Sequence, residues 1–176
     1  MEGFINSSHM DGDVATMFKK KSSRPKVRIL FVDQKNDFSS QMAEYFTRQM
    51  YDDLYEVYSA GPEKDIVDCD MISSMYVVGE DIRRQVSKDF KDRDFLREDE
   101  DYDFVVYTDA RTFEEWKGRV PWQGRQILAQ MRQRSDFAAT DDQELHEEYI
   151  RSMNEVRGWV KEHLADPDGL KAMVVA

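Results

Sequence analysis

The sequence has little cysteine and no long hydrophobic run. One thiol, that of Cys69, cannot form an internal disulfide, which is typical of a reducing compartment. No apolar stretch approaches the length of a membrane span, and the N-terminus has no continuous hydrophobic segment of the secretory kind. We therefore expect a cytoplasmic protein that does not act at a membrane.

Positive charge is also scarce. Lysine and arginine number 25 against 36 aspartates and glutamates, giving a net charge of -11. A general nucleic-acid surface needs clustered cations to displace counterions, so no nucleic-acid partner is expected. His9, His146 and His163 have no metal-binding spacing, and Cys69 is flanked by acids. We expect no metal and no cofactor.

The sequence does have enough hydrophobic residues to form one core. The chain has 176 residues, of which 40% are hydrophobic, and this predicts a single domain. We divide it into a flexible leader (1–25), a domain (26–165) and a C-terminal tail (166–176). The leader ends in a basic cluster, either a docking tail for an acidic partner or a solubilising end, and the second interpretation is favoured.

Strand and helix patterns alternate from Val27 onward. They indicate three β–α pairs, then a short strand and a long helix from about residue 141 to 164. This alternation predicts an α/β fold with a four-stranded parallel sheet and helices on both faces. The final helix has an apolar stripe at intervals of three or four, which we assign to core packing: Leu145, Tyr149, Met153, Val156, Val160 and Leu164.

The first strand runs into a short polar loop, and a helix begins at once. Such a strand–loop–helix is a common anion site, because loop amides and the helix N-terminus converge there. Here, however, an acid, Asp33, is the first residue of the loop.

At this loop the chain resembles the low-molecular-weight protein tyrosine phosphatases and arsenate reductases, whose loop reads Val-Cys-x-x-Asn-x-x-Arg-Ser-x-x-Ala-Glu. Four positions match that pattern: Asn36, Ser40, Ala43 and Glu44. Asp33 stands at the position of the nucleophilic Cys, and Ser39 at that of the phosphate-binding Arg. Further matches follow in the same order at 56–61, 75–82, 87–88, 103–109 and 121–122. The resemblance covers roughly 26–164.

The resemblance implies three catalytic roles, and none is filled here. The family's Cys attacks phosphorus, its Arg binds the phosphate oxygens, and an Asp, usually followed by Pro, protonates the leaving group. The residues directly after Trp122, Gln123-Gly124-Arg125-Gln126, contain no Asp-Pro pair, and Asp166-Pro167 comes after the last helix, too late to reach the site. We therefore expect a catalytically inactive, phosphatase-like protein.

Several roles remain open for Asp33. Its carboxylate could fill the old anion site as a built-in substitute for phosphate, or it could be merely tolerated in a relaxed loop. It could also be a phosphoacceptor or cation ligand in a switch, although Gln34 stands where a second acid is needed. A residual or altered phosphoryl-transfer enzyme using Asp33 is the remaining alternative.

The expected work of the chain is binding a protein partner. Three surfaces are candidates: the vestigial loop with Asp33, Asn36, Ser39 and Ser40, the acidic stretch 88–103, and the basic leader. The candidate interface aromatics are Phe38, Tyr45, Trp116 and Trp122, of which Phe38 and Trp122 are expected to cover the core. Anion binding at the loop is expected to be weak or absent.

Overall fold

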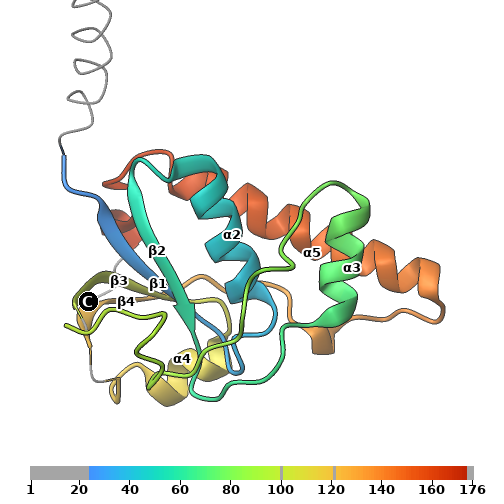
Figure 1. Cartoon of the computed structure of the whole chain (residues 1–176), viewed down its shortest axis with the longest axis horizontal. Coiled ribbons are helices and arrows are strands. Elements are labelled where there is room, and N and C mark those ends of the chain that lie inside the picture. Colours follow the sequence, from blue (N-terminus) through green and yellow to red (C-terminus); the bar gives the residue numbers. More distant parts are fainter. Residues whose placement is uncertain (1–23, 100, 121, 174–176) are drawn as a thin grey trace, which may run out of the picture.

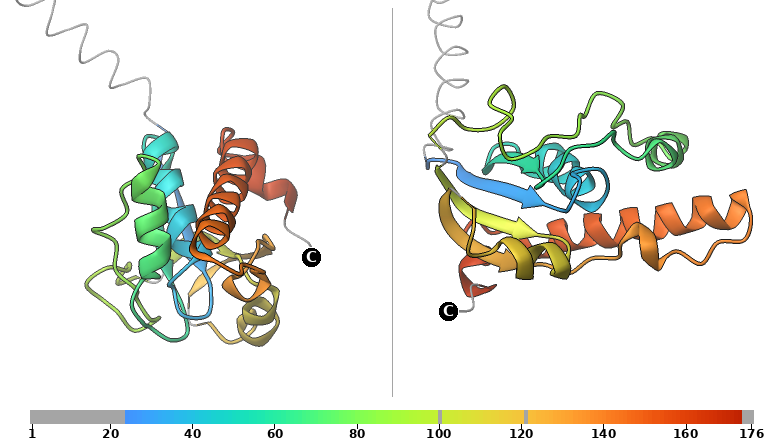
Figure 2. Two further views of the ribbon diagram at one scale, coloured as in Figure 1. Left: turned by 90° about the vertical axis from the view of Figure 1, so that its right-hand side faces the viewer. Right: turned by 90° about the horizontal axis from the view of Figure 1, so that it is seen from below.

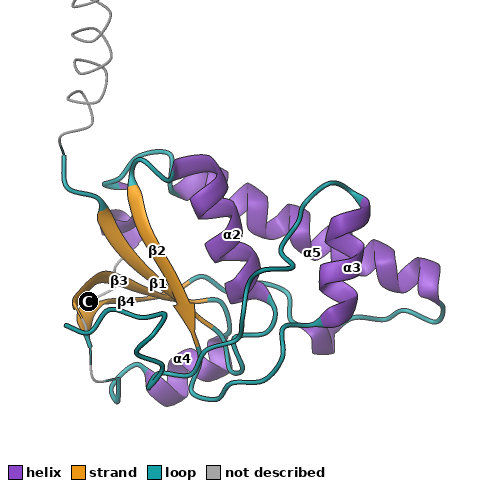
Figure 3. Ribbon diagram, in the orientation of Figure 1, coloured by secondary structure: helices purple, strands orange, loops and turns teal. Residues whose placement is uncertain are grey.

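The computed structural model describes residues 24–99, 101–120 and 122–173 (Figure 1). The interpretations of the leader therefore lie almost entirely outside the described residues. Figure 3 shows the helices and strands, which are, in chain order, β1 (Val27–Val32), α2 (Ser39–Tyr51), β2 (Tyr55–Ala60), α3 (Cys69–Val77), β3 (Asp101–Tyr107), α4 (Ala110–Trp116), β4 (Gln123–Leu128) and α5 (Asp142–His163). Short 3-10 helices occur at Arg134–Asp136 and Gly169–Met173.

The four strands form one parallel sheet in the order β2-β1-β3-β4, which confirms the predicted fold class. β1 lies inside the sheet, with Val32 paired to Ala60 on one side and Tyr107 on the other. Its last four residues are buried, as expected for a strand covered on both faces. All strands end on the same side of the molecule (Figure 2), so the loops after them gather at one edge.

The two faces of the sheet carry separate cores. On one face α2, α3 and α5 pack over side chains such as Phe31 and Val106. On the other face α4 and the loop before β3 pack over Leu30 and Val105. The predicted stripe of α5 is buried in the first core, apart from Leu145, which is half-buried there. Figure 2 shows α2, α3 and α5 side by side.

Two of the segments that match the family, 75–82 and 121–122, lie at the boundaries of α3 and β4. α3 ends at Val77, because Gly79 has a φ of +89°, which a right-handed helix does not contain. β4 begins at Gln123, directly after the matched pair at 121–122, and the Trp122 side chain enters the core.

The acidic stretch before β3 is more than the solvated turn that its composition predicts. It has no helix and no strand of its own up to Asp99, but Phe90 packs edge-on against Trp116 and Trp122, with ring centroids 5.5 and 4.5 Å away. Arg97 pairs with Glu56 at 3.1 Å. A few apolar residues therefore hold this loop on the sheet.

The segment after α5 is part of the domain and does not form a free tail from residue 166. Leu170 is fully buried in the first core. The Tyr55 hydroxyl donates to the carbonyl oxygens of Leu164 and Asp166 at 2.7 and 3.2 Å. The domain therefore extends beyond the boundary at 165, because one apolar side chain and one buried hydroxyl fix the segment.

Candidate functional site

The loop between β1 and α2, residues 33–38, lies at the carboxyl edge of the sheet. β1 has β2 on one side and β3 on the other, so this loop occupies the point at which the strand order reverses. In open parallel sheets, ligands bind in the crevice at such a point. The structure thus brings the four predicted site residues, Asp33, Asn36, Ser39 and Ser40, together, and all four are buried.

Asn36 sets the shape of the loop. Its φ of +48° is in the left-handed region, which asparagine tolerates better than most residues. Its Nδ2 donates to Ser40 Oγ at 2.8 Å, while its Oδ1 accepts from Gln41 Nε2 and the Lys88 amide, both at 2.9 Å. Two of the positions that match the family pattern, Asn36 and Ser40, are therefore joined by a hydrogen bond that shapes the loop.

Gly61, at the end of β2, lets the loop approach the sheet edge. A Cβ at this position would lie 2.4 Å from the Asp33 carbonyl oxygen and 2.9 Å from the Asn36 amide nitrogen. No side chain fits there without moving the backbone. This close approach gives a physical reason for a glycine at the end of the matched segment 56–61.

A buried ion pair supports the loop from beneath. Lys88 Nζ lies 3.3 Å from Glu44 Oε1 and 3.2 Å from Ser59 Oγ, and both charged side chains are almost fully buried. Arg48 also approaches Glu44, at 3.5 Å. Glu44 and Lys88 both belong to segments that match the family, but no pattern in the sequence indicates that they pair.

The carboxylate of Asp33 points toward the start of α2. Its Oδ2 accepts the Ser40 amide at 2.9 Å and the Ser39 hydroxyl at 3.4 Å. The residue at the N-cap of α2, Phe38, has no side chain that can cap the helix. Asp33 therefore serves as a distant cap, with its negative charge at the positive end of the helix dipole.

The other carboxylate oxygen, Asp33 Oδ1, is buried and has no hydrogen-bond partner among the described residues. Burial raises the pKa of Asp33 above its ordinary value, and the hydrogen bond from the Ser40 amide opposes that shift. Ser39, at the position where the family has its phosphate-binding Arg, lies against Thr108, with the two hydroxyl oxygens 2.7 Å apart. Ser39 thus ties the loop to the end of β3.

A cavity of about 660 Å³ opens beside this loop. Its lining is polar and comes from the loop, α4 and the segment after β4: Asp33, Gln34, Lys35, Asp37, Phe38, Glu63, Asp109, Arg111, Glu115, Gln133, Arg134 and Ser135. Asp37 is half-buried, and its pKa is raised to about 6 by burial and by the charges of Asp33 and Asp68. This carboxyl was not singled out from the sequence.

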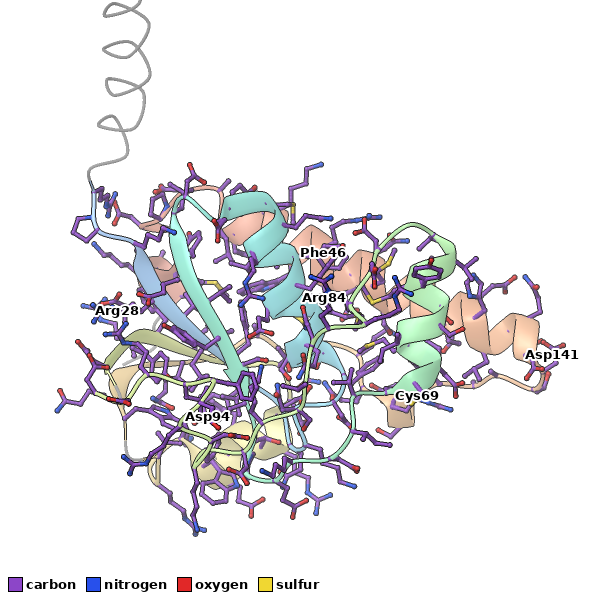
Figure 4. The ribbon with its side chains drawn as sticks, viewed as in Figure 1. Arg28, Phe46, Cys69, Arg84, Asp94 and Asp141 are labelled. Atoms are coloured by element: carbon purple, nitrogen blue, oxygen red, sulfur yellow. The ribbon has the colours of Figure 1, made fainter. Side chains whose placement is uncertain are left out.

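The other candidate groups lie apart from Asp33 or have structural roles. Asp109 caps α4, accepting from the amides of Arg111 and Thr112, although it also lines the cavity. Asp166-Pro167 is at the opposite edge of the sheet, beside the start of β2, as expected. Cys69 is the first residue of α3 and is exposed (Figure 4).

Two of the four aromatic candidates lie in the core, and the other two are half-buried. Phe38 and Trp122 are buried in the cores, which confirms their structural assignment. Tyr45 and Trp116 are half-buried. Tyr45 donates to Glu80 at 2.6 Å, so its hydroxyl already has a partner.

Two kinds of feature are not found in the described ranges. Within them, no cluster of three or more histidine, cysteine, aspartate or glutamate side chains is placed to hold a metal ion. Nor does any helix in these ranges combine the length and the apolar character that crossing a bilayer requires.

No protein-family model and no curated protein matches this chain. Solved structures do match. An arsenate reductase in the phosphate-binding state is 26% identical, with 85% of this chain and 99% of that one covered and a TM-score of 0.53. A low-molecular-weight protein tyrosine phosphatase from T. tengcongensis is 17% identical, with 79% and 98% covered and a TM-score of 0.61. An arsenate reductase from Archaeoglobus fulgidus DSM 4304 is 18% identical, with 78% and 99% covered and a TM-score of 0.59.

These matches confirm the resemblance drawn from the loop and its neighbouring segments. The chain has the fold of the low-molecular-weight protein tyrosine phosphatases and arsenate reductases, a single four-stranded α/β domain.

Proposed function

We propose that this chain is a catalytically inactive phosphatase-like protein that acts as a protein-interaction or regulatory module. The observation that carries the proposal is the position of the Asp33 carboxylate. It stands where the family has its nucleophile, and it already accepts the Ser40 amide that would otherwise face a bound anion. An incoming phosphate would meet a buried carboxylate.

The lost arginine supports the same proposal. Ser39, at the position of the phosphate-binding Arg, offers one neutral hydroxyl, and that hydroxyl lies against Thr108. A guanidinium would supply a full positive charge and a planar pair of donors. Losing one preorganised donor at an oxyanion costs roughly 2.7–4 kcal/mol of transition-state stabilisation. No Asp-Pro pair reaches the site to act as the acid.

One observation favours a second candidate, a residual phosphoryl-transfer enzyme that uses Asp33. Its Oδ1 has no partner among the described residues, and Asp33 lines the cavity. A carboxylate oxygen of this kind could attack phosphorus to give an acyl phosphate. The absence of an arginine at position 39 weighs against it, because Ser39 supplies no positive charge to offset that of an incoming phosphate.

The test is hydrolysis of a small aryl phosphate by the protein and by Asp33→Ala, from mildly acidic to neutral pH. We expect no turnover above the background rate with either. Turnover that disappears in Asp33→Ala would establish the second candidate and overturn the first.

The same variant tests whether Asp33 acts as an internal anion. Removing the carboxylate frees the Ser40 amide, so inorganic phosphate should stabilise Asp33→Ala against thermal unfolding more than it stabilises the unmodified chain. Equal phosphate effects on the two proteins would mean that Asp33 does not occupy an anion site.

A further inference from the structure

A second cavity lies beside α4, on the face of the sheet opposite to α2, α3 and α5. Its volume is about 710 Å³, within the range of roughly 300–1,000 Å³ that ligand pockets have. Most of its lining comes from the loop before β3, so we call it the 89–98 cavity: Pro62, Asp89, Phe90, Lys91, Asp92, Arg93, Leu96, Arg97, Glu98 and Trp116. Because Phe90, Leu96 and Trp116 pack on the second core, they give the cavity an apolar wall.

The same loop exposes a large aromatic side chain, that of Phe95. It is 52% exposed and belongs to neither core of the described chain. Phe95 directly precedes Leu96 of the cavity wall, yet its own ring does not line the 89–98 cavity. Phenylalanine is usually buried, and removing its ring from water is favourable. The loop therefore holds an exposed apolar ring next to an apolar cavity that this ring does not fill.

Charge around the 89–98 cavity is balanced, although the chain as a whole is acidic. The net charge of -11 makes two copies of the chain repel each other in general. The cavity lining, in contrast, carries three cations and three acids: Lys91, Arg93, Arg97, Asp89, Asp92 and Glu98. A second copy can therefore approach this surface without the repulsion that it meets elsewhere.

The signs of the charges alternate along the loop, which reads Lys-Asp-Arg-Asp from 91 to 94. Around a two-fold axis at the middle of this segment, the first charge of one copy faces the last charge of the other, Lys91 against Asp94. The inner pair, Asp92 against Arg93, also has opposite signs. Asp92 is 3.6 Å from Lys64 of its own chain, while the other three charges have no ion pair within the described part of the chain. The segment is thus complementary to a second copy of itself.

We propose that two copies of this chain associate about a two-fold axis, each placing Phe95 in the 89–98 cavity of the other. The axis that pairs the charges also turns Phe95 of one copy toward Phe90 in the cavity wall of the other. A second copy covers the exposed ring and fills the cavity at once, whereas a small ligand would fill the cavity and leave the ring in water. The cavity shares no lining residue with the one beside Asp33, so the proposal goes beyond the proposed function.

The test is sedimentation equilibrium of the full chain from about 1 μM to about 1 mM, a range that covers weak two-fold interfaces. We expect the average molar mass to rise from that of one chain toward that of two. A mass that stays at one chain over the whole range would overturn the proposal. Growth beyond two chains would also overturn it, because a two-fold interface closes on itself.

Two exposed aromatic side chains provide a matched pair of variants. Phe95→Ala should weaken self-association by at least about tenfold, since an aromatic anchor carries much of the energy of a small interface. Tyr76→Ala removes a ring that is also 52% exposed, but this ring belongs to α3, on the opposite face of the sheet, and Arg83 stacks on it at 4.4 Å. Tyr76→Ala should leave the association unchanged. Equal weakening by both variants would mean non-specific apolar contact and would overturn the proposal.

The charge pairing is tested by Arg93→Glu beside Lys161→Glu. Both variants change the net charge by the same amount, but Lys161 is exposed on α5, on the other face of the sheet. Because Arg93→Glu places like charges together across the axis, it should weaken the association more than Lys161→Glu does. Equal weakening would reduce the effect to overall charge and overturn the two-fold pairing.

An NMR dilution series locates the inserted ring. The indole N–H signal of Trp116, in the cavity wall, should shift as the protein concentration rises, and Phe95→Ala should abolish that shift. Trp116→Phe identifies the signal. An unchanged Trp116 signal in a sample that dimerises would place the interface elsewhere and overturn the proposal.

The NMR measurement also distinguishes another occupant of the cavity. If the chain stays monomeric and added N-acetylphenylalaninamide shifts the Trp116 signal, the cavity binds a different ligand and the proposal is overturned. None of these measurements depends on turnover or on Asp33, so aryl phosphate hydrolysis succeeds or fails separately as the test of the proposed function.

Discussion

The residues that hold the loop in place differ from those that face the cavity in how fully their polar groups are paired. We call the first group the frame (Asn36, Glu44, Gly61 and Lys88) and the second group the mouth (Asp33 and Asp37). In the frame, Asn36, Lys88 and Glu44 all have hydrogen-bonded or charged partners, and Gly61 admits the backbone at close range. At the mouth, the buried Asp33 Oδ1 has no hydrogen-bond partner in the described part of the chain, and burial together with the charge of Asp33 raises the pKa of Asp37. The frame therefore fixes the conformation of the loop, while the mouth holds a buried carboxyl and a half-buried one close together.

The largest expected effect comes from breaking the frame at its ion pair. Lys88→Met leaves Glu44 buried with only Arg48 nearby, at 3.5 Å. Removing one member of a buried pair costs about 3 kcal/mol, because Glu44 stays desolvated and the exposed Arg48 compensates its charge only in part. Urea unfolding of the variant should show this loss in the free energy of unfolding.

The control for this prediction is the double variant Lys88→Met/Glu44→Gln. It removes both charges, so it should regain part of the stability that Lys88→Met loses. A double variant less stable than Lys88→Met by the full cost of Glu44→Gln alone would show that the two side chains are not coupled.

The next effect concerns the close approach at Gly61. Gly61→Ala places a Cβ 2.4 Å from a backbone oxygen, and the backbone must shift. We expect a loss of roughly 2–3 kcal/mol in the free energy of unfolding, measured in urea.

Gly158 in α5 provides a matched substitution. It is exposed, and an added Cβ would meet nothing within 4 Å. Gly158→Ala should therefore stabilise the protein by about 0.5–1 kcal/mol, because alanine is the better helix former. The comparison fails if both alanine variants shift stability in the same direction.

The fold was predictable because its signals are local and repeated. The stripe on α5 and the buried run of β1 follow from helical and strand periodicity, and both were confirmed. The position of Trp122 in the core was also predicted correctly. Parallel order follows from the β–α alternation, which requires crossover connections.

Of the two carboxyls at the mouth, the sequence indicated one and not the other. Asp33 was found because the family pattern puts a Cys there, but Asp37 has no sequence signal: its raised pKa depends on Asp33 and on Asp68, which lies before α3. The packing of Phe90 and Leu170 was missed for a similar reason. Each is a single apolar residue in a polar segment, so no periodicity reveals it.

The smallest expected effect is at the mouth itself, and its sign is opposite to those in the frame. The folded protein raises the pKa of Asp37 from 3.8 to about 6, so it binds this proton more tightly than the unfolded chain does. Stability from this group is present below about pH 4 and is lost as pH rises through about 6. Because Asp37 is partly exposed, solvent screening reduces the cost at neutral pH to about 1 kcal/mol.

Asp37→Asn removes this cost, since the amide stays neutral at every pH. The variant should be more stable than the unmodified chain near neutral pH and equally stable near pH 3.5, as measured by urea unfolding at both values. Asp53→Asn, which alters an exposed carboxyl, should show no comparable pH-dependent difference. An equal gain from Asp37→Asn at both pH values would mean that it arises from packing or from the unfolded state. A gain confined to neutral pH would show that the folded protein holds the ionised Asp37 carboxylate at a cost in stability.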